Sequence, residues 1–221
     1  APDHHAEHTT LVLRRRAEAG YRMVESSRRL LENEVLPQYL KRQRWFVADA
    51  PISSVRVLYA LPLPGQSDHY LAEVEVSQGE TTRTYFLPYT LWWTDVSAGS
   101  LPFDVMAWVR RGAETGFMSD AFFSAEFATQ LLELLRDGRE LLVATSSGKG
   151  IIAFQPEPAL KTMAWTHPVS AERFPGEQSN SSVVLGEKAV LKLIRRVAPG
   201  NSPEVEMTRH LGRCGFKNTP L

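Results

Sequence analysis

A series of short alternating segments between residues 52 and 93 constrains the fold of this chain most strongly. The segments "ISSVRVLYAL" (52–61), "YLAEVEVSQ" (70–78) and "TTRTYFLPYTLWW" (81–93) are rich in β-branched and aromatic residues, and turn-forming stretches separate them. Short strands joined by tight connections predict an antiparallel meander. Because Glu73 and Glu75 alternate with apolar residues in the second segment, we expect one face of this sheet to meet water.

Helical periodicity is predicted on both sides of this series. Residues 11–44 carry an approximate 3.6-residue apolar stripe, and Pro37 is expected to interrupt that helix. The period becomes helical again across residues 101–138, where Ser124 is a suitable N-cap for "AEFATQLLELL". The first half of the chain is therefore expected to be a helix packed on a curved antiparallel sheet, in a protein of the α+β class.

The second half is expected to contain further strands and one well-marked helix. Strands are predicted in "GKGIIAFQP" (148–156) and "KTMAWTHPV" (161–169), followed by a loop and a hairpin within residues 176–196. The last helix is predicted within "NSPEVEMTRHLGRCG", because Ser202 can cap it and Pro203 suits its first position.

Composition and charge exclude several classes of function. The chain has 221 residues, with Lys plus Arg equal to 25 and Asp plus Glu equal to 25. A formal charge of zero argues against nucleic acid or an anionic membrane as the main partner. The only cysteine is Cys214, and no apolar run is long enough to span a bilayer, so we expect a cytoplasmic protein.

The hairpin region "GEQSNSSVVLGEKAVLKLIRR" (176–196) carries the residues with the clearest chemical meaning. Five small or polar residues precede its first strand: Gln178, Ser179, Asn180, Ser181 and Ser182. Lys192 lies in the second strand between apolar neighbours, where an ammonium group needs an anionic partner. A loop of small residues allows backbone N–H groups to approach phosphate oxygens, and a strand lysine can reach the α- and β-phosphates of a nucleotide.

A glutamate of the last helix completes this pattern. Either Glu204 or Glu206 can hold the Lys192 ammonium, and we prefer Glu206 because Glu204 lies in the exposed first turn. Spacing alone leaves a second interpretation open, because serine-rich segments are commonly plain turns and strand lysines commonly lie at solvated edges.

The stretch "EQSNSSVVLGEKAVLKLIRRVAPGNSPEVEMTRHL" (177–211) resembles the corresponding segment of the maltokinases, sugar kinases often fused to a trehalose synthase. The resemblance extends to "LPQYLKRQRWF" (36–46) and to "DAFFSAEFATQLLELL" (120–135). It implies an ATP- and Mg²⁺-dependent enzyme that converts maltose to maltose 1-phosphate for the synthesis of glycogen-type α-glucans.

The resemblance also implies a division of the chain. Four parts are expected: a flexible tail (1–10), a cap subdomain (11–100), a helical intermediate region (101–160) and the beginning of a protein-kinase-like N-lobe (161–221). By the same matching, Lys192 is similar to the lysine that binds the ATP phosphates, Glu206 to its helix partner, and residues 178–182 to the phosphate-covering loop.

Two departures from the family pattern bear on activity. The family's R-W-F segment usually continues with glycine and lysine, whereas Val47, Ala48 and Asp49 follow it here. No segment matches the catalytic loop or the Mg²⁺ ligands of the kinase C-lobe, so we expect no catalytic residue and no metal ligand in this chain and no activity of the chain alone.

An alternative is a non-catalytic interaction or carbohydrate-binding module coupled to a trehalose synthase. The aromatic residues of the predicted cap sheet motivate it, because aromatic faces suit sugar rings. Trp92 and Trp93 are adjacent in a predicted strand and must point to opposite faces, which favours a core position for at least one of them.

Overall fold

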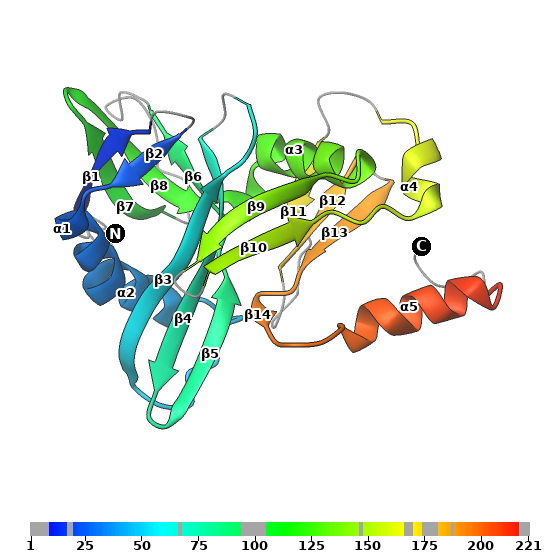
Figure 1. The fold of residues 1–221 in the computed structure, drawn as a ribbon, viewed down its shortest axis with the longest axis horizontal. Helices are drawn as coiled ribbons and strands as arrows, with labels where there is room; N and C mark the ends of the chain where they lie inside the picture. The colour runs from blue at the N-terminus through cyan, green and yellow to red at the C-terminus, as the bar shows by residue number, and fades with distance from the viewer. Residues whose placement is uncertain are drawn as a thin grey trace, which may run out of the picture.

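The structure is a computed structural model of the chain. It describes eight stretches: residues 9–16, 20–65, 68–93, 105–145, 148–165, 170–173, 181–186 and 188–216. Most of the expected N-terminal tail therefore lies outside the described residues. Within them the chain forms an α+β arrangement, with one large sheet, one smaller sheet, a separate hairpin and several helices (Figure 1).

The large sheet has nine strands and is mostly antiparallel. In order along the sheet its path is β14 (Arg196–Val197), β5 (Thr81–Phe86), β4 (His69–Gln78), β6 (Tyr89–Trp92), β8 (Glu114–Asp120), β7 (Val105–Arg111), β1 (Thr10–Arg15) and β2 (Tyr21–Met23), and β3 (Ile52–Pro62) also pairs with β4. The β1–β7 pair is parallel, with Thr10 opposite Trp108.

One continuous helical segment packs against the inner face of this sheet. It consists of α1 (Glu25–Leu30), the π-helix η1 (Leu31–Val35) and α2 (Leu36–Lys41). Pro37 has no N–H for an α-helical bond, and the turn before it widens into a π-helix, so the predicted interruption is a change of helical type. Leu31 and Leu40 of this segment are buried in one core with residues from strands across the sheet.

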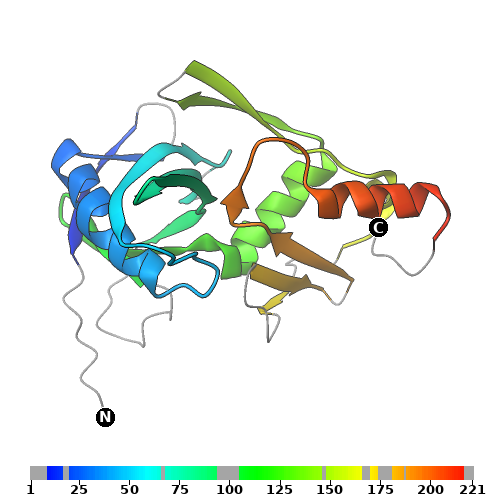
Figure 2. The same ribbon diagram turned by 90° about the horizontal axis from the view of Figure 1, so that it is seen from below.

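A second core lies around α3 (Ala125–Arg136). A hairpin of β9 (Glu140–Thr145) and β10 (Gly148–Ala153) lies on one side of this helix, and a three-stranded sheet lies on the other (Figure 2). That sheet contains β11 (Ala171–Arg173), β12 (Ser181–Leu185) and β13 (Ala189–Leu193), while short helices η3 (Ala121–Phe123) and α4 (Pro158–Thr162) connect the parts. Helix α5 (Pro203–Arg213) follows β14 and extends away from the rest (Figure 1).

Several predicted elements are confirmed. The meander appears as β3 to β6, and in β4 Val74 is buried while Glu73 and Glu75 are only partly covered, as the alternation predicts. Helix α3 begins after Ser124, whose Oγ accepts a hydrogen bond from the Phe127 N–H at 3.3 Å. Helix α5 begins at Pro203 as expected, but no side-chain bond from Ser202 caps it.

Two predicted helical stretches are wrong, because the structure shows strands there. Thr10–Arg15 and Tyr21–Met23 form the antiparallel strands β1 and β2, since alternation in β1 buries Leu11 and Leu13 against the sheet. Residues 105–120 form β7 and β8, and their two short apolar segments, "VMAWV" and "GFM", fit buried strands as well as a helix. At Gly116, strand β8 lies very close to the neighbouring strand β6. A Cβ at this position would lie 1.9 Å from the Trp92 carbonyl oxygen, so this pairing requires glycine. The predicted helical intermediate region thus keeps only α3 as a long helix.

The strand predicted over residues 161–169 is also wrong at its beginning. Lys161 belongs to helix α4, which starts with Pro158 at its first position, where the missing proline N–H is not needed. Residues 163–165 are irregular, and residues 166–169 lie outside the described part of the chain.

Candidate functional site

Lys192 lies in β13 and faces the last helix. Its cross-strand partner in the β12–β13 hairpin is Ser182, so the two side chains project from the same face of the small sheet. The Lys192 Nζ donates a hydrogen bond to Glu204 Oε1 at 2.7 Å, which makes an ion pair between β13 and the first turn of α5. The predicted pairing of this lysine with a helix carboxylate is therefore present.

The identity of that carboxylate differs from our expectation. Glu206 does not contact Lys192 but accepts a hydrogen bond from Asn201 Nδ2 at 2.8 Å. Side chains two positions apart on an α-helix differ by about 200° around its axis, so only one of the two glutamates can face β13. Glu204 shares the inward face with Thr208, one turn later, and that leaves Glu206 pointing outward.

Lys192 is also less buried than its apolar neighbours predicted. Its side chain is 34% exposed and that of Glu204 is 54% exposed. The flanking residues of the same face, Val190 and Ile194, are exposed as well, because α5 lies across a groove from them and does not cover them fully. This ion pair is therefore partly exposed to solvent.

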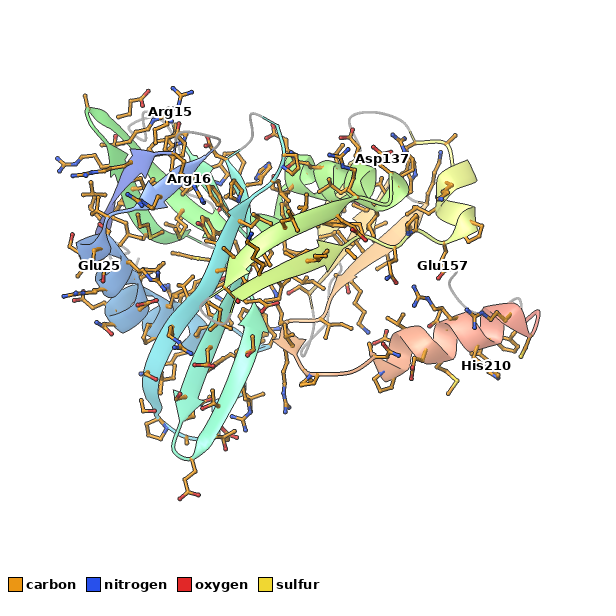
Figure 3. The ribbon with its side chains drawn as sticks, viewed as in Figure 1. Arg15, Arg16, Glu25, Asp137, Glu157 and His210 are labelled. Carbon is orange, nitrogen blue, oxygen red and sulfur yellow. The ribbon has the colours of Figure 1, made fainter. Side chains whose placement is uncertain are left out.

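A groove of about 590 Å³ runs between β13 and α5. Val190, Ile194 and Val205 form its apolar walls, and Lys192, Arg209 and Arg213 contribute positive charge. Arg209 Nε donates to Glu157 Oε1 at 2.7 Å, which ties α5 to the segment before α4. Figure 3 labels Glu157 above helix α5 and His210 on the helix itself. The groove thus combines apolar surface with cations.

The predicted phosphate-covering loop is only partly described. Gln178, Ser179 and Asn180 lie outside the described residues, whereas Ser181 and Ser182 begin β12 and are buried. The Ser182 Oγ is buried, and no hydrogen-bond partner for it is found among the described residues. This enclosed hydroxyl, on the same face as Lys192, keeps its capacity to donate and to accept a hydrogen bond.

Ser181 faces the opposite way and takes part in a buried cluster around Arg195. The Arg195 guanidinium donates through Nη2 to Asp120 Oδ2 at 2.6 Å and through Nε to Ser181 Oγ at 3.1 Å. Asp120 also accepts hydrogen bonds from Tyr39 Oη at 3.1 Å and from the Phe122 N–H at 2.9 Å. The Trp45 ring lies 4.8 Å from the guanidinium carbon, close enough for a cation–π contact.

A comparison with known families identifies the region that supplies most of this cluster. Residues 39–123 match the family described as the maltokinase N-terminal cap domain. Over this segment the chain is similar to a maltokinase cap domain, and we use the term maltokinase cap for residues 39–123. The match begins at Tyr39 and includes Trp45 and Asp120, so the maltokinase cap contributes three of the side chains around Arg195.

The Arg195 cluster fastens the maltokinase cap to the strand that carries Lys192. Arg195 follows Lys192 by only three positions, and its backbone carbonyl accepts a hydrogen bond from the Phe86 N–H of the large sheet at 2.7 Å. Both charged partners are 1% exposed. The end of β13 is thereby fixed by side chains and backbone of the maltokinase cap.

Sequence reasoning missed this cluster. Asp120 has the local pattern of a cap residue, and it does cap η3, but its ionic partner is 75 positions away along the chain. The only available signal was the alternation in "LKLIRR", which places Arg195 on the face opposite Arg196.

The tryptophans of the maltokinase cap make internal contacts. Trp92 Nε1 donates to Ser119 Oγ at 2.9 Å, and the Trp93 ring lies 5.3 Å from that of Tyr21.

Among the described residues no group of three or more His, Cys, Asp or Glu side chains is placed to hold a metal ion. None of the described helices combines the length and apolarity that crossing a membrane requires.

Proposed function

We propose that this chain is the N-terminal part of an ATP-dependent maltokinase that phosphorylates maltose to maltose 1-phosphate. The observation that carries the proposal is the Lys192–Glu204 ion pair, which lies beside an unpaired Ser182 hydroxyl and is fastened to a maltokinase cap domain. A strand lysine held by a helix glutamate is the arrangement with which kinase N-lobes hold nucleotide phosphates.

In this proposal each residue has a separate task. The Lys192 ammonium acts as a point charge toward the α- and β-phosphates, and Glu204 holds that ammonium over the groove. The Ser182 hydroxyl and the segment 178–182 approach the phosphate oxygens. Bound ATP supplies the phosphoryl group, and Mg²⁺ neutralises the phosphate charge.

The proposal assigns the catalytic base and the Mg²⁺ ligands to a C-terminal kinase lobe, which is not among these 221 residues. The chain alone is then expected to have no kinase activity. Transfer to the anomeric hydroxyl of maltose, a role in α-glucan synthesis and association with a trehalose synthase belong to the same proposal.

Replacing Lys192 in the complete kinase tests the assignment. We expect Lys192→Ala to lower turnover of maltose and ATP by at least ~100-fold, a usual effect of removing one preorganised electrostatic group. The matched control is Lys188→Ala in the same hairpin, because the Lys188 Nζ donates to the Ala164 carbonyl oxygen at 2.7 Å and forms no ion pair with any described residue. Near-normal turnover of the Lys192 variant would exclude the proposed role.

The glutamates offer a finer test of the geometry. Glu204→Gln should reduce turnover more than Glu206→Gln, because only Glu204 contacts the lysine.

Calorimetric titration of the 221-residue chain with maltose tests the non-catalytic alternative. Micromolar binding of maltose to this chain would favour a carbohydrate-binding module over a kinase segment.

A further inference from the structure

A cavity lies where the curved sheet does not close on itself. Among the described strands, β2 pairs only with β1 and β3 pairs only with β4, so each presents a free edge. A cavity of about 650 Å³ lies between these edges and extends beneath them to the helical segment α1–η1–α2. We call this space the seam cavity.

Hydrogen bonds close the seam cavity at two ends. At one end the Tyr21 N–H donates to Tyr70 Oη at 2.5 Å. At the other end Arg28 Nη2 donates to the Val57 carbonyl oxygen at 2.9 Å, and the Val57 N–H donates to Glu32 Oε1 at 2.8 Å. The two strand edges are thus held apart at a fixed distance, and the cavity between them is a built feature of the fold.

The floor of the seam cavity is apolar. Leu31 and Leu36 of the helical segment line it, together with Met106 and Met118 from the large sheet. These side chains are buried in the core of the maltokinase cap region, and methionines adapt readily to the shape of an apolar group. A volume of this size is within the ~300–1,000 Å³ that small-molecule sites occupy.

The rim of the seam cavity is strongly basic. Arg14, Arg16, Arg22 and Arg28 line it. Arg14 and Arg22 are register partners across the β1–β2 hairpin, and like charges directly opposite each other are destabilising unless an anion lies between them. Within the described part of the chain, no ion pair involves Arg14, Arg16 or Arg22, whereas Arg28 pairs with Glu32.

Acidic groups on the rim do not neutralise these arginines. Glu25 lines the cavity, but its carboxylate already bonds Arg29 at 3.2 Å. Figure 3 labels Arg16 and Glu25 in this part of the molecule. Burial raises the pKa of Tyr89 inside the cavity, and the charge of Arg16 opposes that rise. Tyr89 therefore stays a neutral hydroxyl.

We propose that the seam cavity binds a small amphipathic phosphate monoester, with its phosphate between Arg14 and Arg22 and its apolar body over Leu31, Leu36 and the methionines. Guanidinium groups pair with phosphate oxygens through two parallel hydrogen bonds, and the unpaired arginines of the rim match a dianionic group better than a singly charged carboxylate. This site lies in the cap region and is separate from the groove at Lys192.

Calorimetric titration of the 221-residue chain with octyl phosphate, below its micelle concentration, tests this proposal. We expect saturable binding with one site per chain. The double substitution Arg14→Gln/Arg22→Gln is expected to weaken it at least tenfold. The matched control is Arg56→Gln, because Arg56 is exposed, pairs with Glu75 at 2.9 Å and does not line the cavity. Circular dichroism checks that each variant keeps its fold.

Two further probes separate the head group from the apolar body. Inorganic phosphate and 1-octanol should each bind at least tenfold more weakly than octyl phosphate, because each lacks one half of the match. Equal binding of inorganic phosphate would reveal only a basic surface, and equal binding of octanol only an apolar void. Either result, or unchanged affinity in the double variant, would overturn the proposal.

Discussion

Two cations three positions apart lie in opposite environments. Arg195 and its partner Asp120 are each 1% exposed, whereas Lys192 and Glu204 are 34% and 54% exposed. The buried pair makes further hydrogen bonds, because Arg195 also donates to Ser181 and Asp120 also accepts from Tyr39, whereas a single hydrogen bond among the described residues joins Lys192 to its carboxylate. A fully enclosed cation holds the architecture together, while a hydrated one can exchange its partner for a ligand.

The same contrast separates the regions to which these pairs belong. Helix α3 buries five residues between the β9–β10 hairpin and the small sheet, whereas α5 buries none among its described residues. Among the described residues, two ion pairs, Lys192–Glu204 and Arg209–Glu157, connect α5 to the rest. Stability is therefore expected to reside in the cap and around α3, and α5 is expected to contribute little.

The largest effect is expected from breaking the buried pair. Asp120→Ala leaves the Arg195 guanidinium enclosed without a carboxylate, and we expect a loss of about 3–5 kcal/mol in the free energy of unfolding. Urea denaturation followed by circular dichroism measures it. Asp120→Ala/Arg195→Met serves as control and should recover part of the loss, because it removes the unpaired charge as well. If the free energy of unfolding of Asp120→Ala were within ~1 kcal/mol of the parent value, the Arg195 cluster would not be what holds the cap to β13.

A smaller effect is expected from the core around α3, measured against α5. Leu132→Ala should cost about 2–5 kcal/mol, because a buried leucine leaves a cavity. Met207→Ala on the exposed surface of α5 should change stability by no more than about 0.5 kcal/mol. Thermal denaturation of the two variants side by side provides the comparison, and similar losses would contradict the division into a stable and a weakly held region.

His69 makes the stability of the cap depend on pH. Burial lowers the pKa of His69, and the nearby Glu126 carboxylate opposes this effect. Because the unfolded chain binds the proton more tightly, the contribution is present above pH ~6.5 and is lost as the pH falls below it, by at most ~1.4 kcal/mol per pH unit. Urea titrations between pH 5 and pH 7 should show a shallower slope for His69→Gln. If the free energy of unfolding of His69→Gln varied with pH as steeply as that of the parent, His69 would not be the group responsible.

The exposed pair should have the smallest effect on stability. A double-mutant cycle with Lys192→Ala and Glu204→Ala is expected to give a coupling energy of about 0.2–1 kcal/mol that decreases with added salt. A coupling as large as that between Arg195 and Asp120 would mean that Lys192 is a structural residue, and the contrast between the two cations would disappear.

Local patterns predicted the elements whose residues follow one period clearly. The meander β3–β6 and helix α3 have clean alternation or clean 3.6-residue spacing, and each was predicted close to its position. Strands β1 and β7 were missed because "LVLRRR" and "VMAWVRR" satisfy both periods over short distances. Pairing between strands far apart in sequence settles such cases, and a single sequence does not reveal that pairing.

The candidate site was predictable in its composition but not in its geometry. The lysine on a strand and the glutamate on the last helix are visible in the sequence, whereas the choice of Glu204 over Glu206 depends on how α5 rotates toward β13. The enclosure of Arg195 depends on Asp120 and Tyr39, which lie far earlier in the chain. Three-dimensional packing determines both features.

The parallel pairing of β1 with β7 has a consequence for biosynthesis. Thr10 leaves the ribosome well before Trp108, its neighbour in the finished sheet. At ~5–20 residues per second the partner strand arrives roughly 100 residues, and therefore several seconds, later. Throughout that interval β1 can pair with β2, but its other edge has no partner, so we expect this edge to be a point of chaperone contact during translation.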